Sequence, residues 1–574
     1  MKYLSLLFFL FACFACSDST NLEAGNEPIT EQVAWKADFR PNIVWIVTED
    51  LSPIIPPFGD STIQTPNLSR LAAEGIRFTN VYSTSGVCAP SRNSIATGMY
   101  HNSIGGNHMR TTSNTKETGL PKYESTPPPS VKMMSEILRM NGYYCTNNSK
   151  NDYQFQAPVT AWDVNGNKGH WRDRAPGQPF FSIFNPTVTH ESGLFESPFN
   201  RNNGYQRYED RILRIPFYHS SDSNYMKPFT QPIHISKDLD FPIPPYLPDN
   251  EITRRDMWKT YNNIAEMDRQ VGIIIDQLEE DGLLDSTIIF WYGDHGGPMP
   301  RQKRLLYDSG LRLPLIVRMP NQWKAGAIDD QLASFVDFAP TVFSLAGIKP
   351  PDYLQGQAFM GTYKAAEERD YIYAAADRLD AQYDGIRAVR DKNFKYLKNL
   401  RPEQAYYLSV KYREHIPTMQ ELLRMRDEGT LNEYQAQWFR QQKPEEELFL
   451  ASEDPHELNN LADDPKYADQ LAKMRQACNQ WMDEINDLGR MEEIDEIKYL
   501  WGGLEQPKTA APAINMANGK ATITCTTEGA SIGYKIVRNG KEPDSWAIYS
   551  APITVPEDSE LKVVAHRIGY KPNK

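Results

Sequence analysis

The sequence has few cysteines, no surplus of basic residues and no internal apolar run long enough for a transmembrane helix. Only six of its 574 residues are cysteine, and the four beyond residue 16 lie far apart, so the fold does not depend on a disulfide framework. Lysine and arginine number 61 against 74 for aspartate and glutamate, which argues against a nucleic-acid-binding protein. With 40% hydrophobic residues, the composition indicates a globular protein of more than one domain.

The longest apolar run stands at the N-terminus and is typical of a secretory signal. Lys2 precedes the run at residues 4–15, which at about twelve residues is too short to span a bilayer. It ends in Phe-Ala-Cys, which resembles a bacterial lipobox with Cys16 as the lipidated residue and Cys13 as a second candidate. We therefore expect an exported lipoprotein of the outer membrane or periplasm, with surface exposure left open and with membrane contact only through its lipid anchor. A plain secretory signal is the alternative.

Buried strands alternate with helical patterns over most of the chain. The strand-like runs are residues 42–48, 180–185, 286–292 and 314–318, and the helical patterns are residues 67–74, 130–140 and 251–280. Continuous apolar runs are typical of strands that are buried on both faces. Their alternation with helices predicts an α/β fold with a central, mostly parallel sheet.

Changes in composition predict five segments. Residues 191–250 are rich in proline and tyrosine, as expected of an insertion that covers or shapes a site. Residues 401–445 are polar and are expected to be helical, and Asn539-Gly540 predicts a tight turn. The predicted segments are 1–16 (signal peptide), 17–40 (linker), 41–385 (main α/β domain), 386–505 (smaller C-terminal α+β subdomain) and 506–574 (short all-β module resembling a sandwich).

Residues 88–98 form the most distinctive segment. Residues 88–92 read Cys-Ala-Pro-Ser-Arg, and Thr-Gly follows at 97–98. A helix N-terminus predicted here, together with the guanidinium of Arg92, favours a bound anion beside Cys88. A buried structural cysteine before a helix is the alternative. The segment resembles the signature of type I, formylglycine-dependent sulfatases, and among them the bacterial polysaccharide sulfatases of the S1 class.

The resemblance covers residues 41–490, including the runs at 65–78 and 446–462, and leaves the β module outside it. It implies an alkaline-phosphatase-like sulfatase fold. It also implies that a formylglycine-generating maturation enzyme oxidises Cys88 to formylglycine (3-oxoalanine). The hydrated aldehyde is a gem-diol, of which one hydroxyl attacks sulfur while the second allows sulfate to leave afterwards.

Two acidic strand ends predict a metal site. Glu49 and Asp50 close the first buried strand, and Asp294 and His295 close another. Ligands gather beyond the carboxyl ends of parallel strands, and carboxylates that meet there favour a hard cation, calcium or magnesium. The resemblance implies Ca²⁺, held by these four residues and by the oxygen at position 88. Glu49 stands where the family usually has aspartate, and its side chain is one methylene longer.

Further catalytic residues follow from the resemblance alone. Lys150 and Lys303 match the two lysines that neutralise sulfate oxygens, and His190 matches the histidine near the leaving group. Asp152 stands where many sulfatases have histidine, and a carboxylate is a weaker base than imidazole. His108 is the alternative source of that imidazole, or else an ordinary loop residue.

The implied activity is a sulfuric ester hydrolase that acts on a sulfated polysaccharide or its oligosaccharides. An algal glycan such as ulvan is favoured over animal glycans on overall resemblance only. A phosphoesterase or phosphonate hydrolase of the same superfold and a non-catalytic glycan-binding lipoprotein are the alternatives. Side chains that could contact sugar or its anionic groups are Tyr205, Tyr208, Tyr225, Tyr246, Arg110, Arg301 and Arg304.

Overall fold

The structure, a computed structural model, describes residues 40–112, 115–196 and 233–573, which belong to one compact unit. The predicted signal peptide with Cys13 and Cys16, the linker up to residue 39 and residues 197–232 of the predicted insertion lie outside the described residues. Within the described ranges no helix combines the length and apolarity needed to cross a membrane. The four cysteines in those ranges are unpaired.

The main sheet has eight strands in the order β4-β3-β5-β1-β6-β7-β2-β8. Only β7 runs antiparallel to its neighbours, which confirms the mostly parallel sheet. All four predicted strands are present, as β1, β5, β6 and β7. The bounds are β1 (Asn42–Thr48), β2 (Ile76–Tyr82), β3 (Tyr144–Asn148), β4 (Val164–Asn165), β5 (Phe180–Phe184), β6 (Thr287–Gly293), β7 (Arg312–Arg318) and β8 (Ile328–Ser334).

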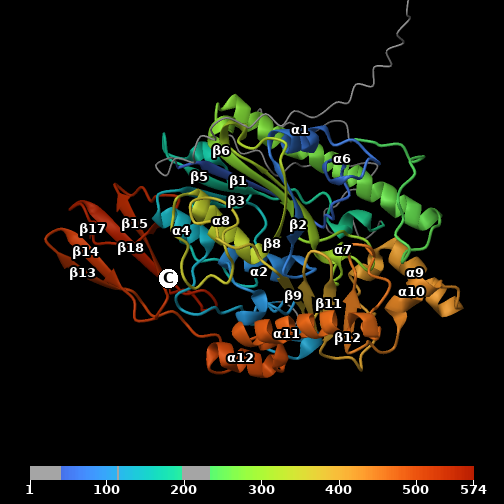
Figure 1. Cartoon of the computed structure of the whole chain (residues 1–574). Helices are drawn as coiled ribbons and strands as arrows, with labels where there is room; N and C mark the ends of the chain where they lie inside the picture. Colours follow the sequence, from blue (N-terminus) through green and yellow to red (C-terminus); the bar gives the residue numbers. More distant parts are fainter. Residues whose placement is uncertain (1–39, 113–114, 197–232, 574) are drawn as a thin grey trace, which may run out of the picture. The chain divides into compact units, whose positions relative to one another are not determined.

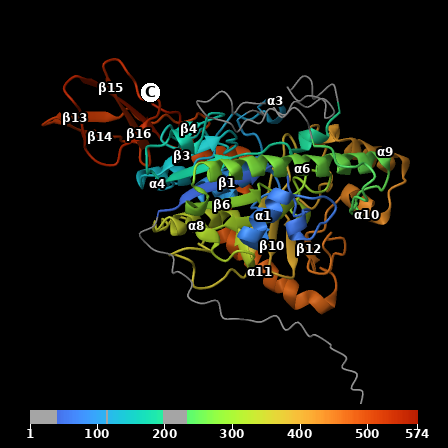
Figure 2. The ribbon, with the colours of Figure 1, turned by 90° about the horizontal axis from the view of Figure 1, so that it is seen from above.

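Helices cover both faces of this sheet (Figures 1 and 2). Helices α1 (Pro66–Glu74) and α6 (Glu251–Glu280) pack on one face, where Val44 and Tyr261 share one core cluster. Helices α2 (Cys88–Thr97), α4 (Met134–Met140) and α8 (Phe338–Leu345) lie on the other, where Trp45 meets Phe338 at 6.0 Å between ring centroids. Strand β1 is therefore buried on both faces, as its unbroken apolar run predicts.

One predicted helix begins later than expected. The pattern at residues 130–140 starts as a helix only at Met134, because the prolines at 127–129 favour an extended chain before it. The carboxylate of Glu136 accepts the backbone N–H of Met133 at 3.1 Å and fixes the helix start. Helix α6 has its predicted bounds, and Asn250 caps it by accepting the N–H of Thr253 at 3.1 Å. Further short helices are α3 (Thr115–Thr118) and α7 (Asp308–Leu311).

A second, antiparallel sheet has the strand order β12-β11-β10-β9 and is covered by α11. Its strand β9 precedes residue 386, so this sheet begins before the predicted start of the C-terminal subdomain. The expected helix over residues 401–445 was wrong in extent: 401–412 lack regular structure, with Tyr406 bonded through its N–H to the carbonyl of Arg440. The bounds are β9 (Ile372–Ala376), β10 (Ile386–Arg390), β11 (Lys395–Asn399), β12 (Glu446–Phe449), α9 (Pro417–Glu428), α10 (Glu433–Ala436), α11 (Ala468–Glu484) and α12 (Glu493–Trp501).

The β module consists of two three-stranded sheets, β13-β14-β17 and β16-β15-β18. Asn539 and Gly540 adopt φ values of 51° and 72°, and the N–H of Lys541 bonds the carbonyl of Arg538 at 2.8 Å, which confirms the predicted tight turn. The bounds are β13 (Ala513–Ala517), β14 (Lys520–Thr524), β15 (Ser531–Arg538), β16 (Ala547–Ile548), β17 (Ile553–Thr554) and β18 (Ser559–His566).

Candidate active site

The carboxyl ends of β1, β3, β5 and β6 bring most of the predicted site residues together. Each strand is followed by a loop that carries polar residues, and helix α2 brings its N-terminus to the same edge. Asp50 and Asp152 follow β1 and β3 with φ values of 44° and 57°. Non-glycine residues rarely adopt such left-handed conformations, which are concentrated at functional sites.

Cys88 is the first residue of α2 and is 3% exposed. Its thiol forms side-chain hydrogen bonds with Asp152 and His295. The positive side chains of Arg92, Lys150 and Lys303 also lie within electrostatic range of the thiol. The preceding segment sets the position of Cys88: helix α1 ends at Gly75, strand β2 follows, and the loop after β2 leads directly into α2, as predicted. Cys88 therefore lies at a helix N-terminus, a position that favours a bound anion.

Three buried carboxylates form the acidic part of the site. Glu49 and Asp50 follow β1, Asp294 follows β6, and all three are at most 1% exposed. The backbone N–H of Asp50 donates to Asp294 Oδ1 at 3.1 Å, which holds the two strand ends together. Like charges this close and this well buried require cations between them.

Three cations surround these carboxylates. Arg92 donates from Nη2 to Glu49 at 2.5 Å and from Nε to Asp294 at 3.1 Å. Lys150 donates to the other oxygen of Glu49 at 2.5 Å, and Lys303 donates to both oxygens of Asp50 at 2.8 Å. The pKa of Asp50 therefore lies well below its usual range, because Lys303 outweighs the effect of burial. The cations of the cluster make it rich in donors for an anion.

The two histidines of the cluster differ in protonation. Burial and the charge of Lys303 lower the pKa of His190 to about 4, so its imidazole is neutral at pH 7. Burial opposes protonation of His295 as well, but Asp294 and Asp50 outweigh it and raise the pKa of His295 to about 10. His190 Nε2 lies 3.2 Å from Lys303 Nζ, which places a potential proton carrier beside a donor.

The donors fit a divalent cation. Glu49, Asp50 and His190 form one group, and Asp50, Asp294 and His295 form another, each with ligand atoms within 4.8 Å of one another. Asp50 belongs to both groups, so the carboxylates of Glu49 and Asp294 each have a ligand atom close to one of Asp50. Such oxygens suit a hard cation, and the raised pKa of His295 reflects the same concentration of negative charge.

Asp152 lies in the cluster and His108 does not. Asp152 lies 3.6 Å from Lys150 Nζ and interacts with Cys88. His108 has both ring nitrogens engaged: Nε2 lies 3.0 Å from Glu496, and Nδ1 accepts the N–H of Arg378 at 3.2 Å. The structure therefore places Asp152, and not His108, beside Cys88, and the role of either residue as the base stays a prediction.

Two of the arginines expected to contact substrate are held by the protein. Arg301 donates to the carbonyls of His456 and Glu457 and stacks on the ring of Tyr246 at 4.6 Å. Arg304 pairs with a buried carboxylate, described below. Arg110 is half exposed and lies 3.6 Å from Asp380. Tyr246 is buried and packs in the core, and Tyr205, Tyr208 and Tyr225 lie outside the described residues.

Sequence reasoning missed three residues of the site. Asn185, directly after β5, accepts from Arg92 Nη1 at 2.7 Å, and its position at a strand end was a usable signal. Glu191 pairs with Arg304 at 2.7 and 2.8 Å and lies 3.2 Å from Lys303. The ring of Tyr412 lies 6.3 Å from that of His190 and packs against the cluster that contains Cys88, although no sequence signal linked it to the site.

Comparisons with known proteins point in one direction. A family model described as Sulfatase matches residues 41–348, and one described as N-sulphoglucosamine sulphohydrolase, C-terminal, matches residues 299–414. The chain is 55% identical to a protein of Formosa agariphila named ulvan-active sulfatase, over 100% of this chain and 96% of that protein. It is 24% identical to the N-sulphoglucosamine sulphohydrolase of Homo sapiens, over 75% and 87% respectively. A structure solved with its substrate D-glucosamine-2-N,6-O-disulfate shares the fold, with a TM-score of 0.52 at 19% identity over 79% of this chain and 100% of that one.

Proposed function

The chain belongs to the sulfatase family, which makes it a sulfuric ester hydrolase, and from that premise we propose that it desulfates a sulfated polysaccharide or its oligosaccharides. The observation that carries the proposal is the convergence of Arg92, Lys150 and Lys303 on the carboxylates around Cys88. A sulfate ester presents peripheral oxygens that need positive donors, and this cluster supplies them.

The side chains divide the work of binding and proton transfer. Arg92 bonds Asp294, Lys150 bonds Glu49 and Lys303 bonds Asp50, so the three cations can together bind the oxygens of a sulfuryl group. His190 Nε2 and Lys303 Nζ lie 3.2 Å apart, so the protonated Lys303 can supply the proton that the departing alcohol requires, directly or through the neutral imidazole of His190. The hydroxyl of Thr189, next to His190, donates to the backbone carbonyl of Glu49 at 2.6 Å and so holds the loop of His190 against the end of β1.

We further propose that Cys88 is oxidised to formylglycine by a maturation enzyme and that the cation is Ca²⁺. The modified residue would supply the attacking hydroxyl, and the cation would supply positive charge beside it. Asp50 and Asp294 would hold the cation, with Glu49 as a further carboxylate, and His295 would join them once its imidazole has lost its proton. Carboxylate oxygens are the ligands that calcium prefers.

Asp152 is the residue best placed to accept a proton from position 88. Its contact with Cys88 and its distance of 3.6 Å from Lys150 keep its carboxylate ionised and close to the reacting atom. Asp152→Asn keeps the shape but removes the base and is expected to lower kcat by about 100-fold or more. Asp152→His, which introduces the usual family residue, is expected to retain more activity. Equal kcat for the wild type and Asp152→Asn would contradict this role.

Ulvan is the favoured substrate. The 55% identical relative is named for activity on ulvan, and that identity extends over the whole chain. Tyr412 supports a sugar substrate, because an aromatic ring beside His190 can face the sugar that carries the leaving oxygen.

Free sulfate released from a glycan panel tests the function. The full chain, produced with a formylglycine-generating enzyme, is incubated with ulvan, carrageenan, fucoidan, chondroitin and heparan oligosaccharides. We expect release from ulvan fragments that stops on chelation, returns with calcium and is lost in Cys88→Ala, with an aldehyde at residue 88 by peptide mass spectrometry. Turnover confined to phosphoesters or phosphonates would favour a phosphoesterase of the same superfold. Glycan binding without turnover would favour the glycan-binding lipoprotein.

We also propose that the protein is exported and lipid-anchored through Cys16. The apolar run and Phe-Ala-Cys at the N-terminus support this, and they lie outside the described residues. Labelling cells with a fatty-acid analogue is expected to mark the wild type but not Cys16→Ala. Label retained in Cys16→Ala would move the anchor to Cys13, and no label in either protein would indicate plain secretion.

A further inference from the structure

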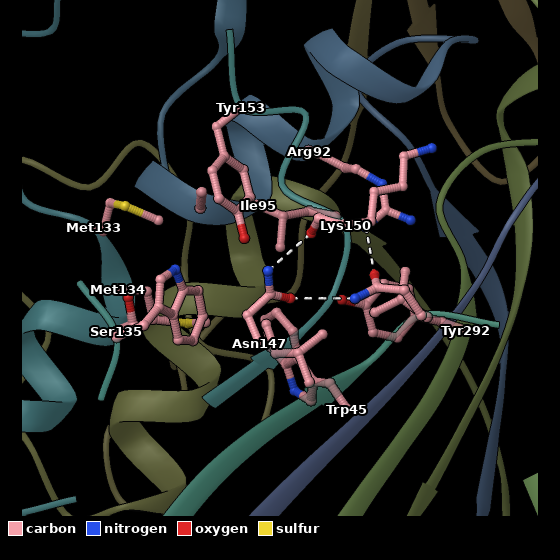
Figure 3. Close-up of a pocket in the computed structure, with 15 residues that line it drawn as sticks. Trp45, Arg92, Ile95, Met133, Met134, Ser135, Asn147, Lys150, Tyr153 and Tyr292 are labelled. Atoms are coloured by element: carbon pink, nitrogen blue, oxygen red, sulfur yellow. Dashed lines mark hydrogen bonds between the residues drawn. The ribbon is translucent and has the colours of Figure 1, made fainter. Parts of the chain in front are cut away.

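The three cations that we assign to sulfate binding are supported by different parts of the chain. Figure 3 shows Arg92 and Lys150 next to each other, with the side chain of Asn147 donating to the carbonyl of Lys150 at 3.0 Å. Arg92 belongs to α2 and Lys150 follows β3, so both are held by the main sheet and its helices. Lys303 lies instead in residues 301–307, a loop outside any helix or strand, which we call the Lys303 loop.

The Lys303 loop is bonded on either side of Lys303 to one turn of the C-terminal subdomain. Arg301, at the start of the loop, donates to the backbone carbonyls of His456 and Glu457 at 2.9 and 3.0 Å. The backbone N–H of Asp308, directly after the loop, donates to Glu457 Oε2 at 2.6 Å. Residues 456–457 therefore hold both ends of the segment that carries Lys303.

Two buried cations fasten the same end of the loop. Lys395 of β11 donates to the carbonyl of Leu306 at 2.7 Å and lies 2.7 Å from Asp308 Oδ1. Arg390 of β10 donates to Asp308 Oδ2 at 3.2 Å, and Glu457 Oε1 lies 3.4 Å from Lys395 Nζ. The four charged residues are at most 8% exposed. Removal of one member of such a buried group leaves the others without compensation, so each member constrains the loop.

The free end of Lys303 reaches the catalytic cluster. Its ammonium donates to both oxygens of Asp50 at 2.8 Å and lies 3.2 Å from His190 Nε2. A displacement of about 1 Å would lengthen these contacts, and a misplacement of that size can lower the rate about 100-fold. We propose that Glu457 is a positioning residue for the reaction and that it acts by holding the Lys303 loop. The proposal rests on the role that the proposed function gives to Lys303.

Backbone conformation supports this role. Arg301, Arg304 and Glu457 have φ values of 63°, 77° and 51°, in the left-handed region. Residues with side chains adopt this region at a cost in free energy, so surrounding contacts must enforce it. The bonds between Arg301 and the turn provide that enforcement for both partners. The run at 446–462, which resembles the family in sequence, thus supports a residue of the site.

The dependence of the rate on the leaving group tests this role. A departing sugar alcohol needs a proton, which Lys303 is proposed to supply, whereas 4-nitrophenolate leaves without one. Glu457→Ala is therefore expected to lower kcat on sulfated ulvan oligosaccharides at least about tenfold more than kcat on 4-nitrophenyl sulfate. A merely structural role would lower both values equally, and that result would overturn the proposal.

Glu457→Gln is the conservative variant and is expected to restore the wild-type balance between the two substrates. Burial outweighs the opposing charge of Lys395 and raises the pKa of Glu457 to about 7, so the neutral carboxyl already occurs near neutral pH. Glutamine has the same shape and keeps an acceptor oxygen for the N–H of Asp308. The ratio of the two kcat values should stay within about threefold of the wild type. A ratio as altered as in Glu457→Ala would contradict the proposed hydrogen bond.

Asp384→Ala is the matched control. Asp384 is a buried carboxylate just before β10, 8% exposed, and it pairs with Lys443 at 2.5 Å and not with the Lys303 loop. The variant is expected to lower Tm and to leave the ratio of the two kcat values unchanged. A change of this ratio as large as that in Glu457→Ala would mean that any loss of stability produces it.

Arg301→Lys tests the other anchor without altering the carboxylates, so the proposal does not depend on the folding of Glu457→Ala. Lysine cannot donate to two carbonyls in the fixed geometry of a guanidinium. Loss of kcat on the oligosaccharides is expected to exceed the loss on 4-nitrophenyl sulfate at least about threefold. Equal losses on the two substrates would count against the loop as the route of the effect.

Crystal structures separate this proposal from the proposed function. In Glu457→Ala the backbone of Lys303 is expected to move by about 1 Å relative to β1, and in Glu457→Gln it should stay in place. An unmoved Lys303 in Glu457→Ala would refute the positioning role. This comparison decides the role even if the wild type turns over neither sulfate ester, a result that would contradict only the proposed function.

Discussion

Glu191 holds two cations next to the reacting atoms. Its carboxylate accepts two hydrogen bonds from Arg304 and lies 3.2 Å from Lys303 Nζ, and the side chain is 1% exposed. The backbone N–H of Glu191 also donates to Asp50 Oδ2 at 2.7 Å. One residue therefore holds both Lys303, which we propose binds sulfate, and Asp50, which we propose binds the cation. It acts through these residues and is a positioning residue.

Glu191→Gln is expected to lower kcat/KM at least about tenfold, because Lys303 loses the anion that orients it. Leaving Arg304 buried without its partner should also lower the free energy of unfolding by about 3 kcal/mol. Kinetics on a sulfate ester and thermal unfolding measure the two effects. Glu196→Gln is the control, since Glu196 pairs with Arg255 at the surface, where such a pair contributes at most about 1 kcal/mol. An unchanged kcat/KM in Glu191→Gln would refute the positioning role.

At the scale of the element, helix α2 is fastened at its C-terminal end by His101. The backbone N–H of His101 donates to Ser94 Oγ at 3.1 Å, and its ring Nδ1 lies 3.3 Å from the same oxygen. The ring is fully buried. Burial and the charge of Arg387 lower the pKa of His101 to about 3. The helix that carries Cys88 and Arg92 thus depends on a neutral imidazole.

This predicts acid sensitivity of the fold. The unfolded chain protonates His101 near pH 6.5, whereas the folded chain does so only near its lowered pKa, so stability is complete above pH 6.5 and is lost as pH falls towards 3. Between pH 7.5 and 5 the loss amounts to about 2 kcal/mol. Thermal midpoints at these two pH values should show a smaller difference in His101→Asn than in the wild type. His234→Asn, at an exposed position, should behave as the wild type. An equal pH dependence in His101→Asn and the wild type would refute the prediction.

At the scale of the whole molecule, the β module is bonded to helix α4 and to the residue just before it. Lys132, just before α4, donates to the carbonyl of Gly529 at 2.7 Å. Arg139 of α4 donates to the carbonyl of Trp546 at 2.8 Å and pairs with Asp163. Both contacts use the backbone of the module, so they depend on its fold more than on its side chains.

Removal of residues 506–574 is therefore expected to lower Tm by several degrees and to reduce turnover of a small aryl sulfate, which needs no glycan-binding module. The physical reason is that Lys132 and Arg139 lose their partners in the module, and helix α4 contacts helix α2, which carries Cys88. Differential scanning fluorimetry and aryl sulfate kinetics on the shortened chain measure both effects. If Tm and kcat on the aryl sulfate both match the full chain, the module is an independent appendage.

The sequence was most informative where chemistry follows directly from strand ends. Asp50 and Asp294 could be placed together because parallel strands end at one edge of a sheet. The pairing of Glu191 with Arg304 could not be predicted, because loops 113 residues apart meet only in the fold. For the same reason the sequence left Asp152 and His108 as alternatives: Glu496, which engages His108, is 388 residues away in the chain. The late start of α4 was missed because the apolar pattern continues through a segment that its prolines keep extended.

The burial of helix α2 sets an order of events in the cell. All ten residues of α2 are buried, including Cys88 and Arg92, so a second protein cannot grasp this segment once the chain has folded. Any enzyme that oxidises Cys88 must therefore meet the segment while it is still extended, before the chain has folded. Supply of that enzyme, and the time between synthesis and folding, would then determine what fraction of the molecules is ever active. Molecules that fold before Cys88 is oxidised would remain stably folded but permanently inactive.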